Sequence, residues 1–387
     1  MDFLRRCWAE ISLDKLVSNL NNIKSLIGTS DICAVVKANA YGHGDKAIVL
    51  QLQKEGVKRF AVATMCEAVH LRKLGVTGDI LLLGGCLDDT FESALQNDIT
   101  LTVFDFDFAK RIANYARKTN KTVKIHIKLN TGMNRVGFDC ITQSDRINTA
   151  NLIYDISKLD CVEVEGIFTH FAVSDEQDSD GYTDFQINCI NELVSLLKQK
   201  GITVKYIHCA NSGAIINKPC AYFNFVRAGI ALYGLYEGYG KPNNFTPILS
   251  LKSVISQIRN IEIGTSVSYG RSFVAKKPMR LATVNIGYGD GYPRSLSSKG
   301  RMLVNGKSCK IVGKVCMDQT VIDITDVDCA VGDTVTVIGT DSGECITALE
   351  IANLDNTINY ETVCNISMRV PRVYYKDGKI AEITQYI

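Results

Sequence analysis

The residue with the clearest capacity for covalent chemistry is a lysine at the end of an apolar run. Lys37 follows Ile32–Val36, which is typical of a buried strand, and precedes Asn39–Gly44, a turn-forming segment. Burying an unpaired ammonium is unfavourable, so such a lysine either reaches water or an ion partner, or has a chemical role. In an apolar wall the neutral amine would be favoured, and it could attack an aldehyde to form a Schiff base.

A second group of residues could hold a phosphate. Arg227 ends the run Phe223–Val226, and Gly229 lets the backbone approach a ligand closely, with its N–H groups suited to an anion. Ser212 could add a hydroxyl donor. Taken singly, Arg227 fits an ordinary ion pair and Ser212 a helix cap. Taken with Lys37, they offer partners for a phosphate and an aldehyde, which is what pyridoxal phosphate presents.

Polar loops elsewhere could bind a substrate. Arg135, in Thr131–Gly137, could hold a carboxylate in a fork. Ser266–Gly270 places the hydroxyl of a tyrosine in a turn, and Asn285–Tyr292 and Cys316–Gln319 are further polar loops. A tyrosine in a loop more often has a packing role than a catalytic one. These loops therefore indicate a binding site only when they are considered together with Lys37 and Arg227.

Alternating strands and helices would position these residues. Ser12–Ile27 reads as a helix with Ser12 as N-cap, and Phe108–Lys118 and Gln186–Lys200 are two of the later helices. Eight apolar runs predict strands: Ile32–Lys37, Arg59–Thr64, Asp79–Gly84, Ile99–Phe104, Thr122–Leu129, Cys161–His170, Thr203–Cys209 and Tyr222–Arg227. Eight β/α units favour a closed parallel barrel, whose active site lies at the carboxyl ends of the strands. Five polar residues occupy such ends or the loops after them: Lys37, Arg135, His170, Ser212 and Arg227.

The pattern of predicted helices and strands changes near Glu237–Phe245, a Gly/Pro/Asn-rich linker. Beyond it helices become scarce and short β-runs dominate: Ile248–Ile258, Arg280–Ile286, Lys310–Val315, Thr320–Ile324 and Thr334–Ile338. We therefore expect a barrel domain over residues 1–238 and a mainly β domain over 239–387, with packing of the first strand in the second domain as an alternative. Gly300–Ser308 has the wrong spacing for a phosphate loop and favours a β-turn between strands.

Composition excludes several classes. The 387 residues carry a net charge of +2, which gives no case for nucleic acid or a membrane surface, and no apolar run is long enough to cross a bilayer. The N-terminal segment lacks a signal-peptide core. The 14 cysteines form no Cys-x-x-Cys pair and suit a reducing cytoplasm, while the five histidines show no metal-ligand spacing.

Nine motifs resemble those of alanine racemases, in the same order and over essentially the whole chain. They are Val36–Gly44, Thr131–Arg135, Thr169–Phe171, Ala210–Ser212, Val226–Gly229, Val267–Gly270, Gly287–Tyr292, Cys316–Asp318 and Thr357–Glu361. The resemblance implies an N-terminal eight-stranded barrel, a C-terminal β domain and a homodimer with composite active sites. It also implies pyridoxal phosphate bound covalently to Lys37.

The resemblance assigns a role to each candidate residue. Five residues would hold the phosphate: Tyr41, Ser212, Gly229, Ile230 and Tyr360. Arg227 would contact the pyridine nitrogen and His170 would flank the ring. Arg135 and the Met317 backbone would face the substrate carboxylate, and Tyr288 with Tyr360 would narrow the entrance. Racemisation needs a base on each face of the substrate, and these would be Lys37 and the partner's Tyr269.

Two positions and three alternatives complete the prediction. Many relatives have Asp where this chain has Asn130, and Lys128 stands where some carry a carbamylated lysine. A serine racemase on the same scaffold is the first alternative, and a decarboxylase of basic amino acids is less favoured. A non-catalytic pyridoxal phosphate carrier would need neither the β domain nor Tyr269. We expect an enzyme that supplies D-alanine for peptidoglycan.

Overall fold

The computed structural model describes residues 6–178, 180–240, 242 and 244–386. Over these residues the chain forms two compact units, each discontinuous in sequence. The barrel unit comprises Val17–Ala40 and Ile48–Phe245, and the β unit comprises 6–16, Tyr41–Ala47 and 246–386.

The division between the units differs in detail from the single one suggested at residues 238/239. The units divide at 245/246, and two N-terminal segments belong to the β unit. Of the predicted linker Glu237–Phe245, Lys241 and Asn243 lie outside the described residues.

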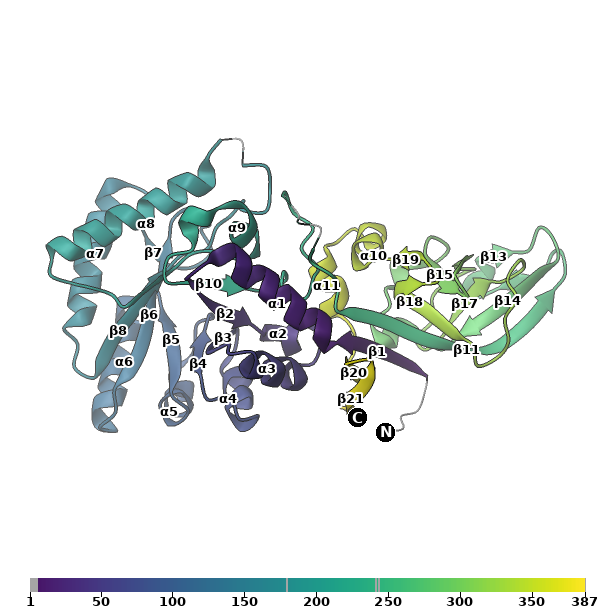
Figure 1. Ribbon diagram of the computed structural model, residues 1–387, viewed down its shortest axis with the longest axis horizontal. Helices are drawn as coiled ribbons and strands as arrows, with labels where there is room; N and C mark the ends of the chain where they lie inside the picture. Colours follow the sequence, from purple (N-terminus) through teal and green to yellow (C-terminus); the bar gives the residue numbers. More distant parts are fainter. Residues whose placement is uncertain (1–5, 179, 241, 243, 387) are drawn as a thin grey trace. The chain divides into compact units, whose positions relative to one another are not determined.

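Eight parallel strands form the barrel in chain order, with the last beside the first (Figure 1). They are β2 (Asp31–Val35), β3 (Arg59–Val62), β4 (Asp79–Leu82), β5 (Ile99–Val103), β6 (Val123–Asn130), β8 (Val162–Phe168), β9 (Tyr206–His208) and β10 (Phe225–Ala228). The ends of this path meet through backbone hydrogen bonds, from Asn224 N–H to Ile207 O at 3.1 Å and from Arg227 N–H to Ala210 O at 2.9 Å. The predicted eight-stranded barrel is confirmed. Its strands read as apolar runs because both of their faces are buried.

Helices cover the outside of the barrel strands, as Figure 1 shows for α4 to α8. The helices are α1 (Leu13–Ile27), α3 (Asp45–Lys54), α4 (Met65–Lys73), α5 (Phe91–Gln96), α6 (Phe106–Lys118), α7 (Gln143–Ser157), α8 (Tyr182–Gln199) and α9 (Ser212–Asn217). The predicted cap of α1 is confirmed, since the Ser12 hydroxyl accepts the Lys15 N–H at 3.2 Å. Short pieces complete the unit: β7 (Phe138–Asp139), η1 (Asp88–Thr90) and η2 (Pro219–Ala221).

The β unit is built around one long strand, β11 (Leu249–Ile261), which pairs with β1 (Cys7–Ser12), β14 (Met279–Val284) and β18 (Thr334–Asp341). The N-terminal strand β1 also pairs in parallel with β20 (Arg372–Lys376), so both ends of the chain enter this unit. Its other elements are β12 (Ser266–Val267), β13 (Phe273–Val274), β15 (Arg301–Val304), β16 (Lys307–Lys310), β17 (Thr320–Asp323), β19 (Glu344–Ile346), β21 (Lys379–Thr384), η3 (Tyr269–Arg271), η4 (Tyr288–Asp290), η5 (Arg294–Leu296), α10 (Ala348–Asp355) and α11 (Asn359–Cys364).

One predicted strand of the β unit is wrong. Lys310–Val315 was expected to be a strand, but β16 ends at Lys310 and only Ile311 forms an isolated bridge beyond it. Asn305 and Gly306, with φ of 51° and 74°, make the turn that begins β16 earlier, and Gly313 with φ of 77° turns the chain away. The same turn confirms that Gly300–Ser308 is a hairpin and not a phosphate loop.

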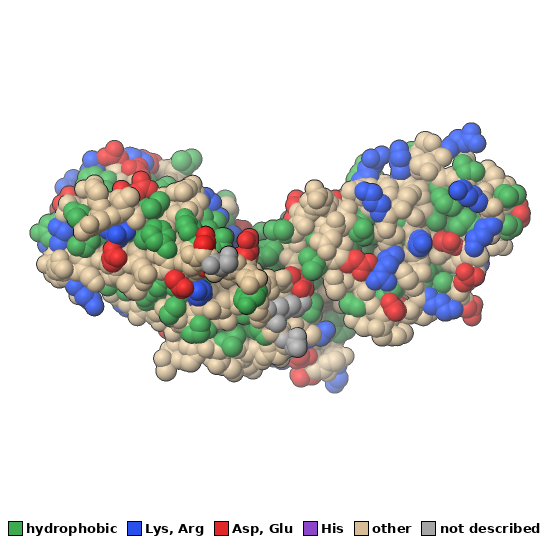
Figure 2. All heavy atoms as spheres, turned by 90° about the horizontal axis from the view of Figure 1, so that it is seen from above, with side chains coloured by type: hydrophobic (Ala, Val, Ile, Leu, Met, Phe, Trp, Pro, Cys, Tyr) green, Lys and Arg blue, Asp and Glu red, His purple; other side chains and the backbone are tan. Residues whose placement is uncertain are grey.

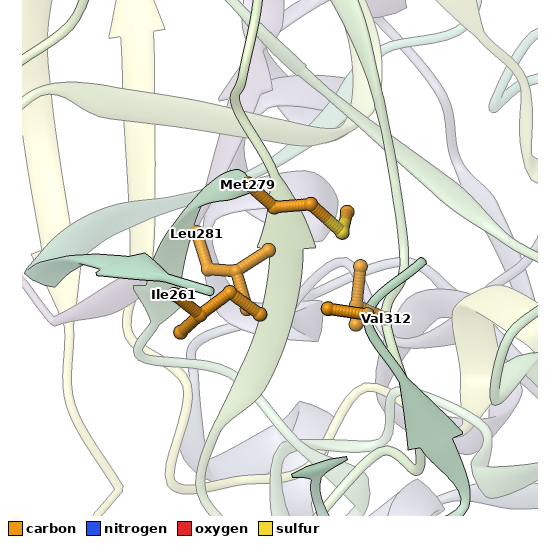
Figure 3. Close-up of a cluster of buried hydrophobic side chains, with 5 residues drawn as sticks. Ile261, Met279, Leu281 and Val312 are labelled. Atoms are coloured by element: carbon orange, nitrogen blue, oxygen red, sulfur yellow. The ribbon is translucent and has the colours of Figure 1, made fainter. Parts of the chain in front are cut away.

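A small apolar cluster stabilises the part of the β unit that carries β12 and β13. Figure 3 shows Ile261, Met279, Leu281 and Val312 pointing toward one another. The strand residues Val267 and Phe273 pack against this cluster.

Charged side chains of both signs are interspersed over the face of the molecule in Figure 2. None of the described helices is both long and apolar enough to cross a bilayer.

Candidate active site

Lys37 lies just beyond the carboxyl end of β2, at the start of a left-handed turn (α2, Lys37–Tyr41). Ala38, Asn39 and Ala40 have φ between 52° and 54° and ψ between 49° and 52°, and Tyr41 has φ of 53°. This conformation costs an L-residue roughly 1–2 kcal/mol, so four in succession persist only where their surroundings hold them. The turn was predicted, but not its hand.

Hydrogen bonds within the barrel unit hold the first half of this turn. The Val36 N–H donates to Ala61 O at 3.0 Å, which continues the pairing of β2 with β3. The Ala40 N–H donates to Val36 O at 2.9 Å, and the Ala38 N–H donates to the Glu67 carboxylate at 2.6 Å. The backbone on both sides of Lys37 is therefore anchored.

Glycines allow the next segment to pack closely within the β unit. Arg372 donates from Nε and Nη2 to Gly42 O at 3.0 and 2.9 Å. A Cβ atom at Gly42 would lie 2.0 Å from Val363 O, and one at Gly44 would lie 1.8 Å from the hydroxyl of Tyr374. Both glycines have positive φ, so no larger residue fits this path without strain.

Arg227, near the end of β10, is 3% exposed and almost completely hydrogen-bonded. Its Nη1 donates to His208 O at 2.9 Å and lies 3.0 Å from His208 Nδ1. Its Nη2 donates to Thr169 O (2.8 Å) and Cys209 O (3.0 Å) and lies 3.1 Å from His170 Nδ1. Among the described residues, only the Nε–H group of this guanidinium has no acceptor. Burial lowers the pKa of Arg227 to about 10, which leaves it protonated at neutral pH.

A chain of imidazoles leads from Arg227 into the barrel. Because a guanidinium only donates, His208 Nδ1 accepts, so the proton of His208 lies on Nε2. That nitrogen lies 2.8 Å from His126 Nδ1, and His126 Nε2 in turn lies 3.5 Å from Glu165 Oε2. His208 Nε2 therefore donates to His126 Nδ1, which places the proton of His126 on Nε2, on the side of Glu165. The nearby His126 and Lys205 lower the pKa of Glu165 to about 2.

Both imidazoles of this chain are buried and neutral. Burial lowers the pKa of His208 well below its usual value, helped by His126 and Arg227, and burial also lowers the pKa of His126. For His170, burial and then Arg227 lower the pKa in the same way. A neutral His170 can accept from Arg227, which an imidazolium could not do.

Ser212 lies at the start of α9 and organises the loop after β10. Its hydroxyl oxygen accepts the N–H groups of Gly229 and Ala231, each at 3.2 Å. The helix cap is the preceding residue, Asn211, whose side chain accepts the Ala214 N–H at 3.0 Å, so the cap reading of Ser212 is wrong. The hydroxyl hydrogen of Ser212 has no acceptor within the described part of the chain.

Lys128 is a buried lysine among cations. Its Nζ donates to Leu129 O at 2.8 Å and lies 5.3 Å from the centre of the Phe168 ring. Burial, followed by the charges of Arg227 and Arg135, lowers the pKa of Lys128 to about 7. A substantial fraction of this amine is therefore neutral at physiological pH.

Asn130 shapes the loop that carries Arg135. Its amide nitrogen donates to Asn134 Oδ1 at 2.8 Å and Asp139 Oδ1 at 2.9 Å, and its Oδ1 accepts the N–H groups of Gly132 and Asn134. An Asp at this position could not donate to Asp139, so the amide suits this loop. Arg135 itself is exposed.

Tyr269 stands at the tip of the hairpin between β12 and β13 and is 69% exposed. The preceding Ser268 is fixed by two hydrogen bonds to Lys314, donating to its O at 3.0 Å and accepting from its N–H at 2.9 Å. Val267 and Phe273 anchor both strands in the cluster of Figure 3. The hairpin is therefore held firmly while its tyrosine points away from the core.

Tyr288 and Met317 lie on two loops of the β unit that touch. The Gly289 N–H donates to Met317 O at 2.8 Å, and a Cβ at Gly287 would lie 2.5 Å from Met317 O. The fully buried Asp290 closes the first loop by accepting the Gly287 N–H at 2.9 Å. Tyr288 is 43% and Met317 54% exposed, and the Met317 N–H has no hydrogen-bond acceptor among the described residues.

Arginines on two sides neutralise the buried Asp290. Arg6 donates to its carboxylate at 2.6 and 3.1 Å, and Arg369 donates from Nε at 2.8 Å.

Tyr41 and Tyr360 lie close together in the β unit. Their ring centres are 6.2 Å apart. Burial, with a smaller contribution from Tyr360, raises the pKa of Tyr41, so its hydroxyl stays protonated and can donate.

The structure distributes the predicted site residues over both units. The barrel unit brings Arg227 against His170 and Ser212 against Gly229, with Ile230 buried beside them. The β unit holds Tyr41, Tyr269, Tyr288, Met317 and Tyr360.

Sequence reasoning missed His208, His126 and Glu67. His126 and His208 point inward from strands at positions where apolar residues are usual. That polarity was the available signal, but it does not show which residues meet across strands.

A parallel barrel with polar side chains at the carboxyl ends of its strands is the arrangement of barrel enzymes. The family model for the alanine racemase N-terminal domain matches residues 11–237, and that for the alanine racemase C-terminal domain matches residues 248–374. The chain belongs to the alanine racemase family, and the resemblance seen in its motifs is confirmed.

Comparisons with individual proteins support the same family. An alanine racemase of Clostridium tetani is 44% identical over 390 residues, covering 99% of each chain. The structure of an alanine racemase of Clostridium difficile 630 has a TM-score of 0.93 at 38% identity and covers 100% of both chains. A histidine racemase of Leuconostoc mesenteroides has a TM-score of 0.86 at 31% identity, covering 96% of this chain and 98% of its own.

Proposed function

We propose that this protein interconverts L-alanine and D-alanine with pyridoxal phosphate as cofactor. One observation carries the proposal: Lys37 lies just after β2, the buried Arg227 lies near the carboxyl end of the adjacent parallel strand β10, and Arg227 keeps one N–H group without an acceptor among the described residues. Membership of the alanine racemase family supports an amino acid as the substrate.

The residues present fit this cofactor. When bound, pyridoxal phosphate supplies an aldehyde carbon that an amine can hold and a ring that withdraws electrons from the substrate's α-carbon. Lys37 would hold the aldehyde carbon, and the open Nε–H of Arg227 would donate to the pyridine nitrogen beside His170. The phosphate would be held by Ser212, Gly229, Ile230, Tyr41 and Tyr360.

Arg227 sets the protonation of the pyridine nitrogen. With the cofactor bound, a protonated guanidinium could only donate to the pyridine nitrogen, which would favour the unprotonated form of that nitrogen. This would limit how much negative charge the ring could accept from the substrate. Arg227 would therefore disfavour side reactions such as transamination, while Lys37 would move the proton.

Two proton carriers act on opposite faces of the substrate. The Lys37 amine removes the α-proton of one enantiomer, and the hydroxyl of the partner's Tyr269 serves the other face. The exposure of Tyr269 on an anchored hairpin supports a role in the site of a second copy. The proposed assembly is a homodimer with composite active sites.

The substrate side chain is proposed to be a methyl group. Arg135 and the Met317 N–H would hold the carboxylate, while Tyr288 and Tyr360 would narrow the entrance. Discrimination against one added hydroxyl in such a pocket is modest, about 1–3 kcal/mol. Serine should therefore react more slowly than alanine.

Lys128 is proposed to carry a carbamate formed with dissolved carbon dioxide. Its neutral amine and the absence of a carboxylate among the described residues that shift its pKa support this modification. The carbamate would replace a cation by an anion next to Arg135 and Arg227. It would then orient Arg135 toward the substrate carboxylate.

The proposed location is the cytoplasm, with D-alanine supplied to peptidoglycan. All 14 cysteines are free, which supports a reducing compartment.

Racemisation of separate L-amino acids tests the proposal. The purified protein with pyridoxal phosphate is incubated with L-alanine, L-serine or L-histidine, and formation of each D-enantiomer is followed. We expect alanine to react fastest. Serine or histidine turnover equal to that of alanine would refute the substrate assignment, and no racemisation at all would refute the function.

A further inference from the structure

The carboxylate of Glu67 joins the turn at Lys37 to the neighbouring βα loop. Glu67 lies in the first turn of α4, where its Oε2 accepts the N–H groups of Ala63 and Thr64 at 2.9 and 3.0 Å. Its other oxygen, Oε1, accepts the Ala38 N–H at 2.6 Å. A capping box needs an acceptor only for the N-cap N–H, so the contact with Ala38 goes beyond what α4 requires.

The two peptide groups that flank the Lys37 Cα atom are held separately. In the group before it, Val36 O accepts the Ala40 N–H at 2.9 Å. In the group after it, the N–H belongs to Ala38 and donates to Glu67. The orientations of these two groups set the backbone angles of Lys37, and therefore the direction in which its side chain leaves the backbone.

The charge of Glu67 suits this task. A hydrogen bond from an N–H to an ionised carboxylate is shorter and stronger than one to a neutral acceptor. It acts where the backbone changes hand, immediately before three residues with φ and ψ near +50°. Without an anchor at Ala38, the backbone would lower its conformational free energy by returning toward right-handed angles.

We infer that Glu67 is a positioning residue for Lys37: its carboxylate caps α4 and at the same time fixes the peptide group after Lys37, which aims the lysine amine. The inference rests on the proposed function of Lys37. Glu67 touches neither substrate nor cofactor in this account, and acts only through the backbone.

Comparison of Glu67→Ala with Thr64→Ala tests this role. Thr64→Ala removes the other half of the capping box, the bond from the Glu67 N–H to the Thr64 hydroxyl, and keeps all three bonds to the Glu67 carboxylate. Both holoenzyme variants should lose thermal stability through the weakened cap. Only Glu67→Ala should lower kcat, by about 10- to 100-fold with little change in KM, because a small misplacement of a reacting group has effects of this size. Pyridoxal phosphate bound to Lys37 should give an absorption band that changes with pH. Glu67→Ala should also shift the pH midpoint of that change.

Equal kcat and equal pH midpoints in the two variants would overturn the inference. Should Glu67→Ala fail to fold, Glu67→Gln serves instead. Its carbonyl oxygen can still accept one N–H, but its amide group opposes the others, so kcat should fall between the wild type and a full loss. A wild-type kcat in Glu67→Gln together with an unshifted midpoint would overturn the inference in that case.

A crystal structure of the variant separates this inference from the proposed function. If the wild-type protein neither racemises alanine nor shows the absorption band, the proposed function fails. The backbone of Ala38–Ala40 in Glu67→Ala, or in Glu67→Gln if the first does not fold, still tests the anchor. Changed φ angles support it, and unchanged left-handed angles contradict it.

Discussion

The barrel unit and the β unit present their functional side chains in opposite ways. In the barrel unit, Arg227 is buried and all but one of its nitrogens have acceptors among the described residues, and Ser212 is held between backbone groups. In the β unit, Tyr269, Tyr288 and Met317 are largely exposed, although the loops that carry them are fixed. The barrel residues are thus preorganised for a ligand, whereas the β-unit residues are presented outward.

This difference bears on the proposed homodimer. A side chain fixed by its own unit needs no further partner, as Arg227 illustrates. An exposed tyrosine on an anchored hairpin has protein groups around its hydroxyl only when another surface covers it. Substitutions in the two units should therefore have different signatures.

Lys37→Ala should have the largest effect. It removes the amine that is proposed to hold the cofactor and to act as one of the two bases, so racemisation and the absorption band of the bound cofactor should both be lost. Absorption spectra and a racemisation assay measure this. Lys58→Ala, at the opposite end of the neighbouring strand β3, is the control and should keep both. A Lys37→Ala protein that retains the band would contradict the assignment.

Tyr269→Phe should have the next largest effect. Loss of one proton carrier should slow racemisation by about 10²–10⁴-fold, with proton removal from one enantiomer affected more than from the other. Because the side chain is exposed, unfolding stability should stay unchanged. Exchange of the α-proton with deuterated solvent, started from each enantiomer, measures the asymmetry. Tyr154→Phe, another exposed tyrosine, should have no effect. Equal losses from both enantiomers would argue against two bases.

The buried imidazoles His126, His170 and His208 should make the protein sensitive to acid. Their pKa values are lowered in the folded state, so below about pH 6.5 the unfolded chain binds more protons and stability falls. The slope is roughly 1.4 kcal/mol per pH unit for each neutral histidine. Glu165 contributes little between pH 6.5 and 5, because its carboxyl is mostly ionised in both the folded and the unfolded chain over this range.

Urea unfolding between pH 7.5 and 5 measures this slope. His126→Asn should reduce it by the share of one histidine. A free energy of unfolding that is independent of pH over this range would contradict neutral, buried imidazoles in the folded protein.

Carbamylation of Lys128 should give the smallest effect on activity but a specific signal. In ¹³C-enriched bicarbonate, a carbamate carbon resonance should appear by NMR and be absent in Lys128→Arg. Because only the neutral amine reacts, the signal should weaken as the pH falls below the lowered pKa of about 7. No difference between the two proteins would show that Lys128 is unmodified.

The sequence predicted the barrel better than the contacts inside it. All eight barrel strands follow from apolar runs, because strands buried on both faces leave a strong local signal. The bounds of β1 and β20 were not predicted, since both strands pair with segments far away in the chain.

The site was predictable in its residue types but not in its geometry. Lys37 and Arg227 could be named from their places after apolar runs. The left-handed turn could not, because Ala38 and Ala40 have no preference for positive φ. The chain from Arg227 to His126 depends on which side chains meet across strands, and a linear pattern does not contain that information.

Subunit complementation tests the central claim most directly, that the β unit of one copy completes the barrel site of another. Lys37→Ala and Tyr269→Phe proteins are mixed, dissociated and allowed to reassemble. In a mixed dimer with composite sites, one site contains both substitutions and the other contains neither. Alanine racemase activity should therefore return to about a quarter of the wild-type value, as expected for random pairing in a two-fold dimer. Activity no higher than the sum of the separate variants would show that Lys37 and Tyr269 act within one chain, or not together at all.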